Sequence, residues 1–192
     1  MKTEAQNRRL WFWWLVLIAL IAFGVLLILQ IDVLRKRAEV GQPGLYAVSE
    51  FIDGDTVAVN MNGSNEIIRM IGVDTPETHR PNTPVQCYGP QAADYIKRLI
   101  GKSRVRLQAD PLNTNRDRYD RLLRYVYLPD GTLVEEKLIS EGYGFAYTLF
   151  PYQRIDDFKG FEAVAKAAGK GLWSACQVIV QPNGLKQTNP AN

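Results

Sequence analysis

The sequence has little of several features that most directly indicate a function. It contains one histidine and two cysteines, and its net charge is only +3 in 192 residues. No internal repeat is visible, so the chain is not a repeat array. The small net charge gives no general argument for nucleic-acid binding, and the single histidine, His79, is interpreted as a solvated loop residue rather than a catalytic base. With 46% hydrophobic and 22% charged residues, the chain has room for one globular domain and an appendage.

Charged residues are absent from the stretch between Leu10 and Leu29. Its length matches the roughly 20 residues that a helix needs to cross about 30 Å of hydrocarbon, and it predicts a transmembrane anchor at residues 10–31 after a short flank at residues 1–9. A cleaved signal peptide is the alternative, but small residues should then follow an apolar core of about 7 to 15 residues. Here Gln30-Ile-Asp-Val-Leu-Arg-Lys-Arg follows, and basic residues on both sides leave the orientation undecided.

After the anchor, the sequence divides into a linker, a domain and a tail. Gly41, Pro43 and Gly44 indicate a linker at residues 32–44. The domain is expected at residues 45–176, and residues 177–192, rich in Gln, Asn and Pro, are predicted to be a disordered tail. Alternating apolar residues between turn signals predict strands at residues 46–52, 56–61, 67–73, 103–109 and 123–128.

Three helices are expected between and after these strands. Pro90 suits a first helical position, and Gly101 should end that helix. The second helix is predicted to begin with a capping box formed by Thr132 and Glu135, and the third to run from about residue 155 to residue 169. Strands and helices in this order indicate an α+β domain that contains a small barrel.

Three segments carry the side chains of greatest chemical interest. Residues 68–79 begin as a strand and become a loop at Pro76, which leaves Asp74 and Glu77 just past the strand end. The other two segments are the turn at residues 53–56, Asp-Gly-Asp-Thr, and the basic segment at residues 116–127. Acidic residues near a proline turn are ordinarily solvated, so the first segment is weak evidence by itself. Together, the segments place arginines and carboxylates at strand ends, an arrangement suited to holding a hard cation beside a basic side chain.

Together these segments resemble the staphylococcal nuclease (thermonuclease) family. The shared motifs span about Tyr46 to Ser174 and follow the family's order: Asp-Gly-Asp-Thr, Arg69-x4-Asp-Thr-Pro-Glu-Thr, Tyr88-Gly-Pro, Asp117-x-Tyr-x-Arg and Gly171-Leu-Trp. The resemblance implies an α+β fold, a five-stranded OB-fold β-barrel capped by three α-helices, preceded here by one transmembrane helix.

The resemblance also implies the catalytic and metal-binding roles. Arg69 and Arg121 would clamp the scissile phosphate, because a guanidinium stays charged and donates two hydrogen bonds to a phosphate. Glu77 would act as general base or position the attacking water. Calcium, a hard ion that tolerates irregular oxygen ligands, would be held by Asp55, Asp74 and the main-chain carbonyl of Thr75.

Contacts with the rest of the substrate are implied for Arg118, Tyr119 and Tyr147. Leu149 stands where the family has a second tyrosine. This departure puts part of the base or phosphate pocket in doubt unless Phe150 or Tyr152 takes over the role.

Two functions from different classes fit these residues. The first is a membrane-anchored, Ca²⁺-dependent nuclease that acts on DNA and RNA, with single strands favoured and no protein partner predicted. The second is a non-catalytic OB-fold module that binds nucleic acid without cutting it. The complete set of two arginines and three carboxylates favours the enzyme. An anchored structural protein ranks last, because it would leave the arginines without a task.

The two cysteines bear on the open question of orientation. Cys87 precedes the first expected helix, and Cys176 follows the Gly-Leu-Trp motif. A bridge between them would close a long loop, which is worth about 4 kcal/mol in the chain-entropy model. Two unpaired buried thiols are the alternative, since the sequence does not give the Cα separation. A bridge would favour an oxidising compartment and so predicts a cytoplasmic N-terminus with the domain on the other side of the membrane.

Overall fold

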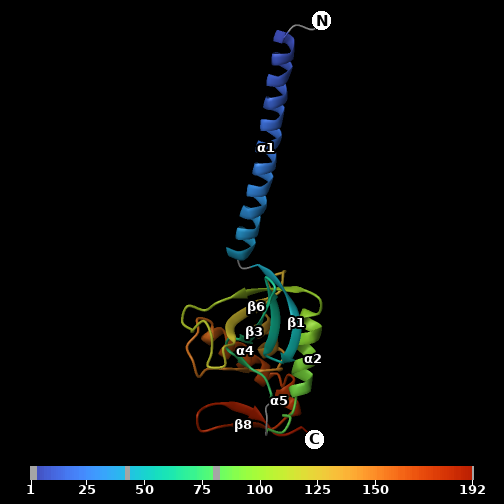
Figure 1. Ribbon diagram of the computed structural model, residues 1–192. Helices are drawn as coiled ribbons and strands as arrows, with labels where there is room; N and C mark the ends of the chain where they lie inside the picture. Colours follow the sequence, from blue (N-terminus) through green and yellow to red (C-terminus); the bar gives the residue numbers. More distant parts are fainter. Residues whose placement is uncertain (1–3, 42–43, 80–82, 192) are drawn as a thin grey trace. The chain divides into compact units, whose positions relative to one another are not determined.

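The computed structural model describes residues 4–41, 44–79 and 83–191, in two compact units comprising residues 1–42 and 43–192. The second unit contains a closed barrel with strand order β1-β2-β3-β6-β5 (Figure 1), so the predicted α+β fold with a five-stranded barrel is confirmed. β3 pairs with β6 in parallel, and the other neighbouring strands are antiparallel. The strands are β1 Leu45–Asp53, β2 Thr56–Met61, β3 Ser64–Met70, β5 Arg104–Gln108 and β6 Leu122–Tyr127.

Two tight turns set the register of the first three strands. Asn62 and Gly63 both have positive φ, 57° and 93°, and connect β2 to β3. This is the geometry that an Asn-Gly hairpin requires, because its twist matches that of the strands. Asp53 pairs with Thr56 across the β1–β2 turn. The turn residues are therefore Gly54 and Asp55, which places the buried side chain of Asp55 at the end of the barrel where β1 turns into β2.

Helices and the inward faces of the strands share one core. Val57, Val59, Ile68 and Met70 alternate along β2 and β3 and are buried, as expected for the inner face of a small barrel. The helices are α2 Gly89–Ile100, α3 Val134–Ser140, α4 Ile155–Ala167 and the short α5 Leu172–Ala175. A further pair of two-residue strands, β4 Val73–Asp74 and β7 Phe145–Ala146, joins the end of the barrel to the segment that follows α3.

The predicted capping box at the start of α3 is wrong. Leu133 occupies the N-cap position, and no side chain caps the helix. Glu135 is instead fully buried, and its carboxylate accepts the main-chain N–H of Val126 in β6 at 3.0 Å. Burial in the core raises the pKa of Glu135 well above its ordinary value. Glu135 therefore joins α3 to the barrel, because its side chain points inward rather than back towards the helix terminus.

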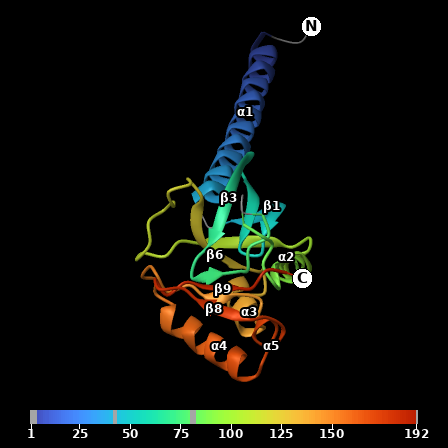
Figure 2. The same cartoon turned by 90° about the horizontal axis from the view of Figure 1, so that it is seen from below.

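The predicted disordered tail is also wrong. Residues 178–188 form a hairpin of β8 Val178–Val180 and β9 Lys186–Thr188, which crosses the face of the domain that carries α3 and α4 (Figure 2). A disulfide joins Cys87 to Cys176, with a Cα separation of 5.9 Å. Main-chain hydrogen bonds to residues 85 and 87 hold the end of the hairpin. The polar composition suggested disorder, but this segment gains order from main-chain pairing and a covalent tie, neither of which needs an apolar core.

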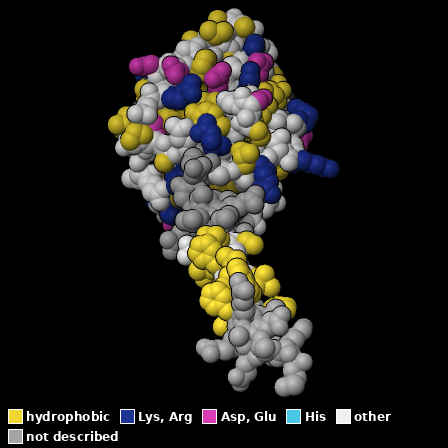
Figure 3. All heavy atoms as spheres, turned by 90° about the horizontal axis from the view of Figure 1, so that it is seen from above, with side chains coloured by type: hydrophobic (Ala, Val, Ile, Leu, Met, Phe, Trp, Pro, Cys, Tyr) yellow, Lys and Arg dark blue, Asp and Glu magenta, His cyan; other side chains and the backbone are white. Residues whose placement is uncertain are grey.

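The first unit contains the helix α1 Glu4–Gly41. A stretch of 20 residues, Trp11–Gln30, has a mean hydropathy of 2.9 and exposes mainly hydrophobic side chains (Figure 3). It is long and apolar enough to cross a membrane, and a signal sequence would satisfy the same criteria. The helix continues through residues 32–41 of the expected linker, because residues 32–40 contain no glycine or proline that would interrupt it. Linker residues 42 and 43, like residues 1–3 of the N-terminal flank, lie outside the described residues.

Candidate active site

Arg69, on β3, lies at the centre of the site, and its guanidinium is held by main-chain oxygens and carboxylates of nearby residues. Its side chain is 14% exposed. Nη1 donates to the main-chain oxygens of Met70 and Val73, at 3.0 and 2.8 Å. Nη2 donates to Asp74 Oδ1 at 2.9 Å and lies 3.2 Å from Asp55 Oδ2. Burial alone would lower the pKa of Arg69, but the two carboxylates raise it and keep the guanidinium charged.

Asp55 is oriented by the residues around the β1–β2 turn. Its Oδ2 accepts the main-chain N–H of Thr75 at 3.0 Å and the Thr75 hydroxyl at 3.2 Å. Its Oδ1 accepts the hydroxyl of Thr56 at 2.9 Å. Gly54 permits this approach, because a Cβ there would lie 2.8 Å from Thr75 Oγ1. The Asp-Gly-Asp-Thr motif therefore packs directly against the loop that follows β4.

Glu77 lies three residues beyond Asp74, next to a carboxylate that we did not single out from the sequence. The side chain of Asp53 accepts the hydroxyl of Thr78 at 2.9 Å and interacts with the side chain of Glu77. Burial, followed by the negative charge of Asp55, raises the pKa of Asp53 to about 6. The repeated Asp in Asp-Gly-Asp is the sequence signal that could have identified Asp53, since both carboxylates belong to one tight turn.

Strand pairing places Arg121 beside β3, the strand that carries Arg69. It immediately precedes β6, where Leu122 pairs with Ile68 of β3. Its Nε and Nη2 both lie 2.7 Å from Asp117 Oδ2. Burial alone would raise the pKa of Asp117, but the hydrogen bonds from Arg121 outweigh this and lower it. Asp117 therefore orients the guanidinium of Arg121, whose side chain remains 28% exposed.

The predicted substrate-binding residues lie around these arginines. The guanidinium of Arg118 donates to the hydroxyl of Tyr119 at 2.7 Å, and the Arg121 guanidinium lies 5.4 Å from the centre of the Tyr119 ring. Burial and the nearby charge of Asp74 raise the pKa of Tyr147, whereas Arg69 and Arg118 oppose this rise. Tyr147 therefore lies close enough to Asp74, Arg69 and Arg118 to interact with their charges.

Only one of the two residues expected to replace the missing tyrosine at position 149 has an exposed aromatic ring. Tyr152 is 2% exposed and packs against Phe158 in the core. It is therefore unable to meet a substrate in this conformation. Phe150 is 60% exposed and lies beside Tyr147, with ring centres 6.0 Å apart, while Leu149 is 40% exposed. Of the two expected replacements, only Phe150 offers an accessible ring.

The carboxylate oxygens around Arg69 are of the type that a hard cation prefers. Among the described residues there is no group of three or more His, Cys, Asp or Glu side chains that could hold a metal ion. Asp55 and Asp74 converge on one nitrogen of Arg69, and Thr75 contacts Asp55 directly. Such oxygen ligands are compatible with calcium, which takes six to eight oxygens in irregular geometry.

A closed five-stranded barrel with an arginine and carboxylate cluster at its strand ends is an OB-fold domain with a site suited to phosphate groups. Residues 67–175 match the model of one family, the staphylococcal nuclease homologues. The chain belongs to this family.

Named relatives support the same assignment. The chain is 37% identical to a thermonuclease of Staphylococcus hyicus over 163 residues, which cover 81% of this chain and 95% of the relative. It is 42% identical over 125 residues to two proteins of Bacillus subtilis, the SPbeta prophage-derived endonuclease YokF and the endonuclease YncB. These matches cover 64% of this chain, but only 42% of YokF and 58% of YncB.

Proposed function

We propose that this protein is a Ca²⁺-dependent nuclease that hydrolyses phosphodiester bonds of DNA and RNA, with single strands favoured and little sequence preference. Family membership supports the reaction class, as do relatives named thermonuclease and endonuclease. The observation that carries the proposal is the convergence of Asp55 and Asp74 on the largely buried side chain of Arg69. Such a cluster has a cation for phosphate and oxygen ligands for a metal within a few ångströms of each other.

The proposed mechanism assigns one task to each group. Arg69 and Arg121 donate hydrogen bonds to the phosphoryl oxygens, where negative charge accumulates as water attacks phosphorus. Glu77 takes a proton from that water, so that an oxygen–phosphorus bond forms on one side while the bond to the leaving oxygen breaks on the other. The leaving oxygen takes a proton from solvent. Arg118, Tyr119 and Tyr147 orient the substrate through phosphate contacts and stacking on bases.

Asp55, Asp74 and the Thr75 carbonyl would hold the calcium ion. When bound, calcium would supply positive charge that stabilises the phosphoryl oxygens and helps to orient water. Arg69 already neutralises part of the charge of the two carboxylates. The barrel core contains none of these ligands, and the domain should therefore remain folded without the ion.

The test is a cleavage assay with the purified full-length chain in detergent. A labelled single-stranded oligonucleotide should be cut in the presence of Ca²⁺, more slowly with Mg²⁺, and not at all in excess chelator. Circular dichroism should be unchanged by the chelator. Binding of the oligonucleotide without cleavage under every condition would establish the non-catalytic binding module instead, whereas full activity in chelator would remove the metal from the mechanism.

We further infer that residues 10–31 anchor the protein in a membrane, with the N-terminus in the cytoplasm and the nuclease domain outside it. The apolar stretch in α1 supports the anchor, and the Cys87–Cys176 disulfide supports an oxidising compartment. Protease added to intact cells should degrade the domain, and thiol labelling in the isolated membrane should find neither cysteine free. A protected domain with two alkylated cysteines would reverse this orientation.

A further inference from the structure

The C-terminal strap, defined as residues 177–191, pairs with the segment that leads into α2. The N–H of Cys87 donates to the carbonyl of Asn189 at 2.7 Å, and the hydroxyl of Thr188 donates to the carbonyl of Cys87 at 2.7 Å. The N–H of Ala191 donates to the carbonyl of Val85 at 2.8 Å. These contacts form a short antiparallel ladder, which begins next to the disulfide at Cys176.

Gln86 carries this ladder one step further, to Glu77. The main-chain N–H of Gln86 donates to the carbonyl of Glu77 at 2.9 Å, and Gln86 Oε1 accepts the main-chain N–H of Glu77 at 2.9 Å. On its other side, Gln86 forms a bridge with Pro190 of the strap. Both peptide groups that flank the Cα of Glu77 are therefore held by one residue, which is itself held by the strap.

Lys186, at the start of β9 in the strap, is linked to the strand that carries Asp74. Lys186 Nζ lies 2.7 Å from Glu162 Oε2 in a mostly buried pair. Glu162 Oε1 accepts the main-chain N–H of Ala146 at 3.0 Å. Ala146 in turn pairs with Val73, the residue before Asp74. The strap is thus connected indirectly to both ends of the loop between Asp74 and Glu77, through Glu162 at one end and through Gln86 at the other.

We propose that the strap and Gln86 are positioning elements for the nuclease reaction, holding the main chain of Glu77 so that its carboxylate faces the attacking water. This inference rests on the proposed function, because it assigns Glu77 to water activation. Gln86 does not touch the reacting atoms and acts through Glu77. A displacement of about 1 Å in a reacting group lowers a rate by roughly a hundredfold, so loss of this support should reduce turnover far more than substrate binding.

The strap itself buries little of its own large apolar side chains, which makes its removal a practical test. The side chains of Ile179 and Val180 are 42% and 64% exposed. A chain that stops after Gln177 retains the disulfide and loses the ladder. Gln86→Met has nearly the same size as glutamine but has no oxygen to accept the N–H of Glu77. Gln86→Glu restores an acceptor, and Gln91→Met, at an exposed position of α2, is the matched control.

The experiment measures kcat and KM on single-stranded DNA with the full-length chain and these variants, well below their melting temperatures. Gln86→Met and the truncated chain should lower kcat roughly 10- to 100-fold, with KM changed less than about threefold. Gln86→Glu should recover most of the activity, and Gln91→Met should match the parent. The truncated Gln86→Met chain should be no slower than the truncated chain alone, since both changes break the same connection.

Hydrogen exchange at the Glu77 amide gives a second measurement that does not depend on activity. Truncation or Gln86→Met should increase exchange at this amide, while amides of β2 and β3 keep their protection. If the parent does not cleave DNA, the proposed function fails, but unchanged protection of the Glu77 amide would still overturn the positioning role. Variants with a lower melting temperature but parental kcat and exchange would show that the strap only stabilises the fold.

Discussion

The two halves of the site differ in where their structural support comes from. In the barrel half, Asp55, Arg69 and Asp74 lie on neighbouring strands and turns, and their hydrogen bonds join residues at most 20 positions apart. In the loop half, Glu77 is held by Gln86, whose neighbour Cys87 bonds to Thr188, 101 positions along the chain. One half is therefore built by local motifs and the other by the end of the chain.

Rough magnitudes explain why the loop half needs distant support. Glu77 and Gln86 are nine positions apart, and closing such a loop costs on the order of 2 kcal/mol from chain-length entropy alone. The two hydrogen bonds between these residues contribute about 1 kcal/mol each, which only offsets that cost. The hydrogen bonds to the strap and the Cys87–Cys176 disulfide add the stabilising free energy that keeps Glu77 and Gln86 together. Arg69 needs no comparable aid, since β3 is paired on both sides.

The largest expected effect is on the free energy of unfolding and comes from the Cys87–Cys176 disulfide in the loop half. Replacing both cysteines by serine, in Cys87→Ser/Cys176→Ser, should lower the free energy of unfolding by about 4 kcal/mol in the chain-entropy model. The disulfide spans 89 positions, and its loss therefore frees a large loop in the unfolded chain. Urea unfolding measures the change. A loss below about 1 kcal/mol would indicate that the loop half is already held without the tie.

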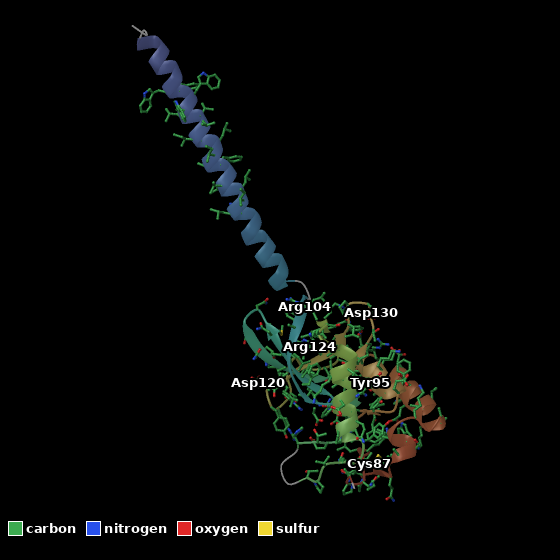
Figure 4. All side chains as sticks on the ribbon, turned by 90° about the vertical axis from the view of Figure 1, so that its right-hand side faces the viewer. Cys87, Tyr95, Arg104, Asp120, Arg124 and Asp130 are labelled. Atoms are coloured by element: carbon green, nitrogen blue, oxygen red, sulfur yellow. A yellow bond between two sulfur atoms is a disulfide. The ribbon has the colours of Figure 1, made fainter. Side chains whose placement is uncertain are left out.

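The second prediction concerns the barrel half, where Arg121→Ala should lower kcat/KM at least about a hundredfold, because one transition-state contact is lost. Steady-state cleavage of single-stranded DNA measures the effect. Arg104→Ala is the control, because Arg104 is exposed and lies at the opposite end of the domain from Cys87 (Figure 4). Equal losses in both variants would point to general electrostatics rather than to a specific contact.

The third prediction concerns the pH dependence of stability that buried Glu135 gives to the barrel half, apart from any role in catalysis. The pKa of Glu135 is raised in the folded state, whereas in the unfolded chain it lies near 4.5. Between these two values the folded protein binds more protons, so stability should fall as pH rises, by up to about 1.4 kcal/mol per pH unit. Glu135→Gln should flatten this dependence in unfolding experiments between pH 5 and pH 8. An unchanged slope would show that other groups are responsible.

The smallest expected effect concerns the pocket wall at Leu149. Leu149→Tyr adds a ring beside Tyr147, and stacking on a base is worth about 1 to 3 kcal/mol at a well-formed site. Because position 149 is partly exposed, we expect KM to fall only about three- to tenfold at constant kcat. Leu112→Tyr, at another exposed leucine, is the control. No change in KM would mean that Phe150 already fills this role.

The contrast between the halves also explains what the sequence could and could not predict. The turn signals and the alternating strands predicted the barrel, because these signals act over a few residues. The same local motifs pointed to Asp55, Arg69 and Asp74, which the structure brings into contact. Their functional roles remain predictions.

Features that depend on distant contacts were missed or misread. The strap looked disordered because its order comes from pairing with residues 85–87 and from a disulfide, neither of which leaves a local pattern. Glu135 was read as a cap residue, since only the tertiary fold shows that its carboxylate accepts from Val126. Gln86 had no signal of its own, because its partner Glu77 lies across a loop.

The most direct test of the account separates binding from chemistry at Glu77. Single-turnover cleavage of a labelled single-stranded oligonucleotide in Ca²⁺, with anisotropy as the measure of binding, compares the parent with Glu77→Gln. We predict a Kd within about threefold of the parent, because the arginines remain, and a cleavage rate at least about a hundredfold lower, because the base is lost. Cleavage by Glu77→Gln at the parental rate would contradict the assignment of Glu77 and with it the division of the site into two halves.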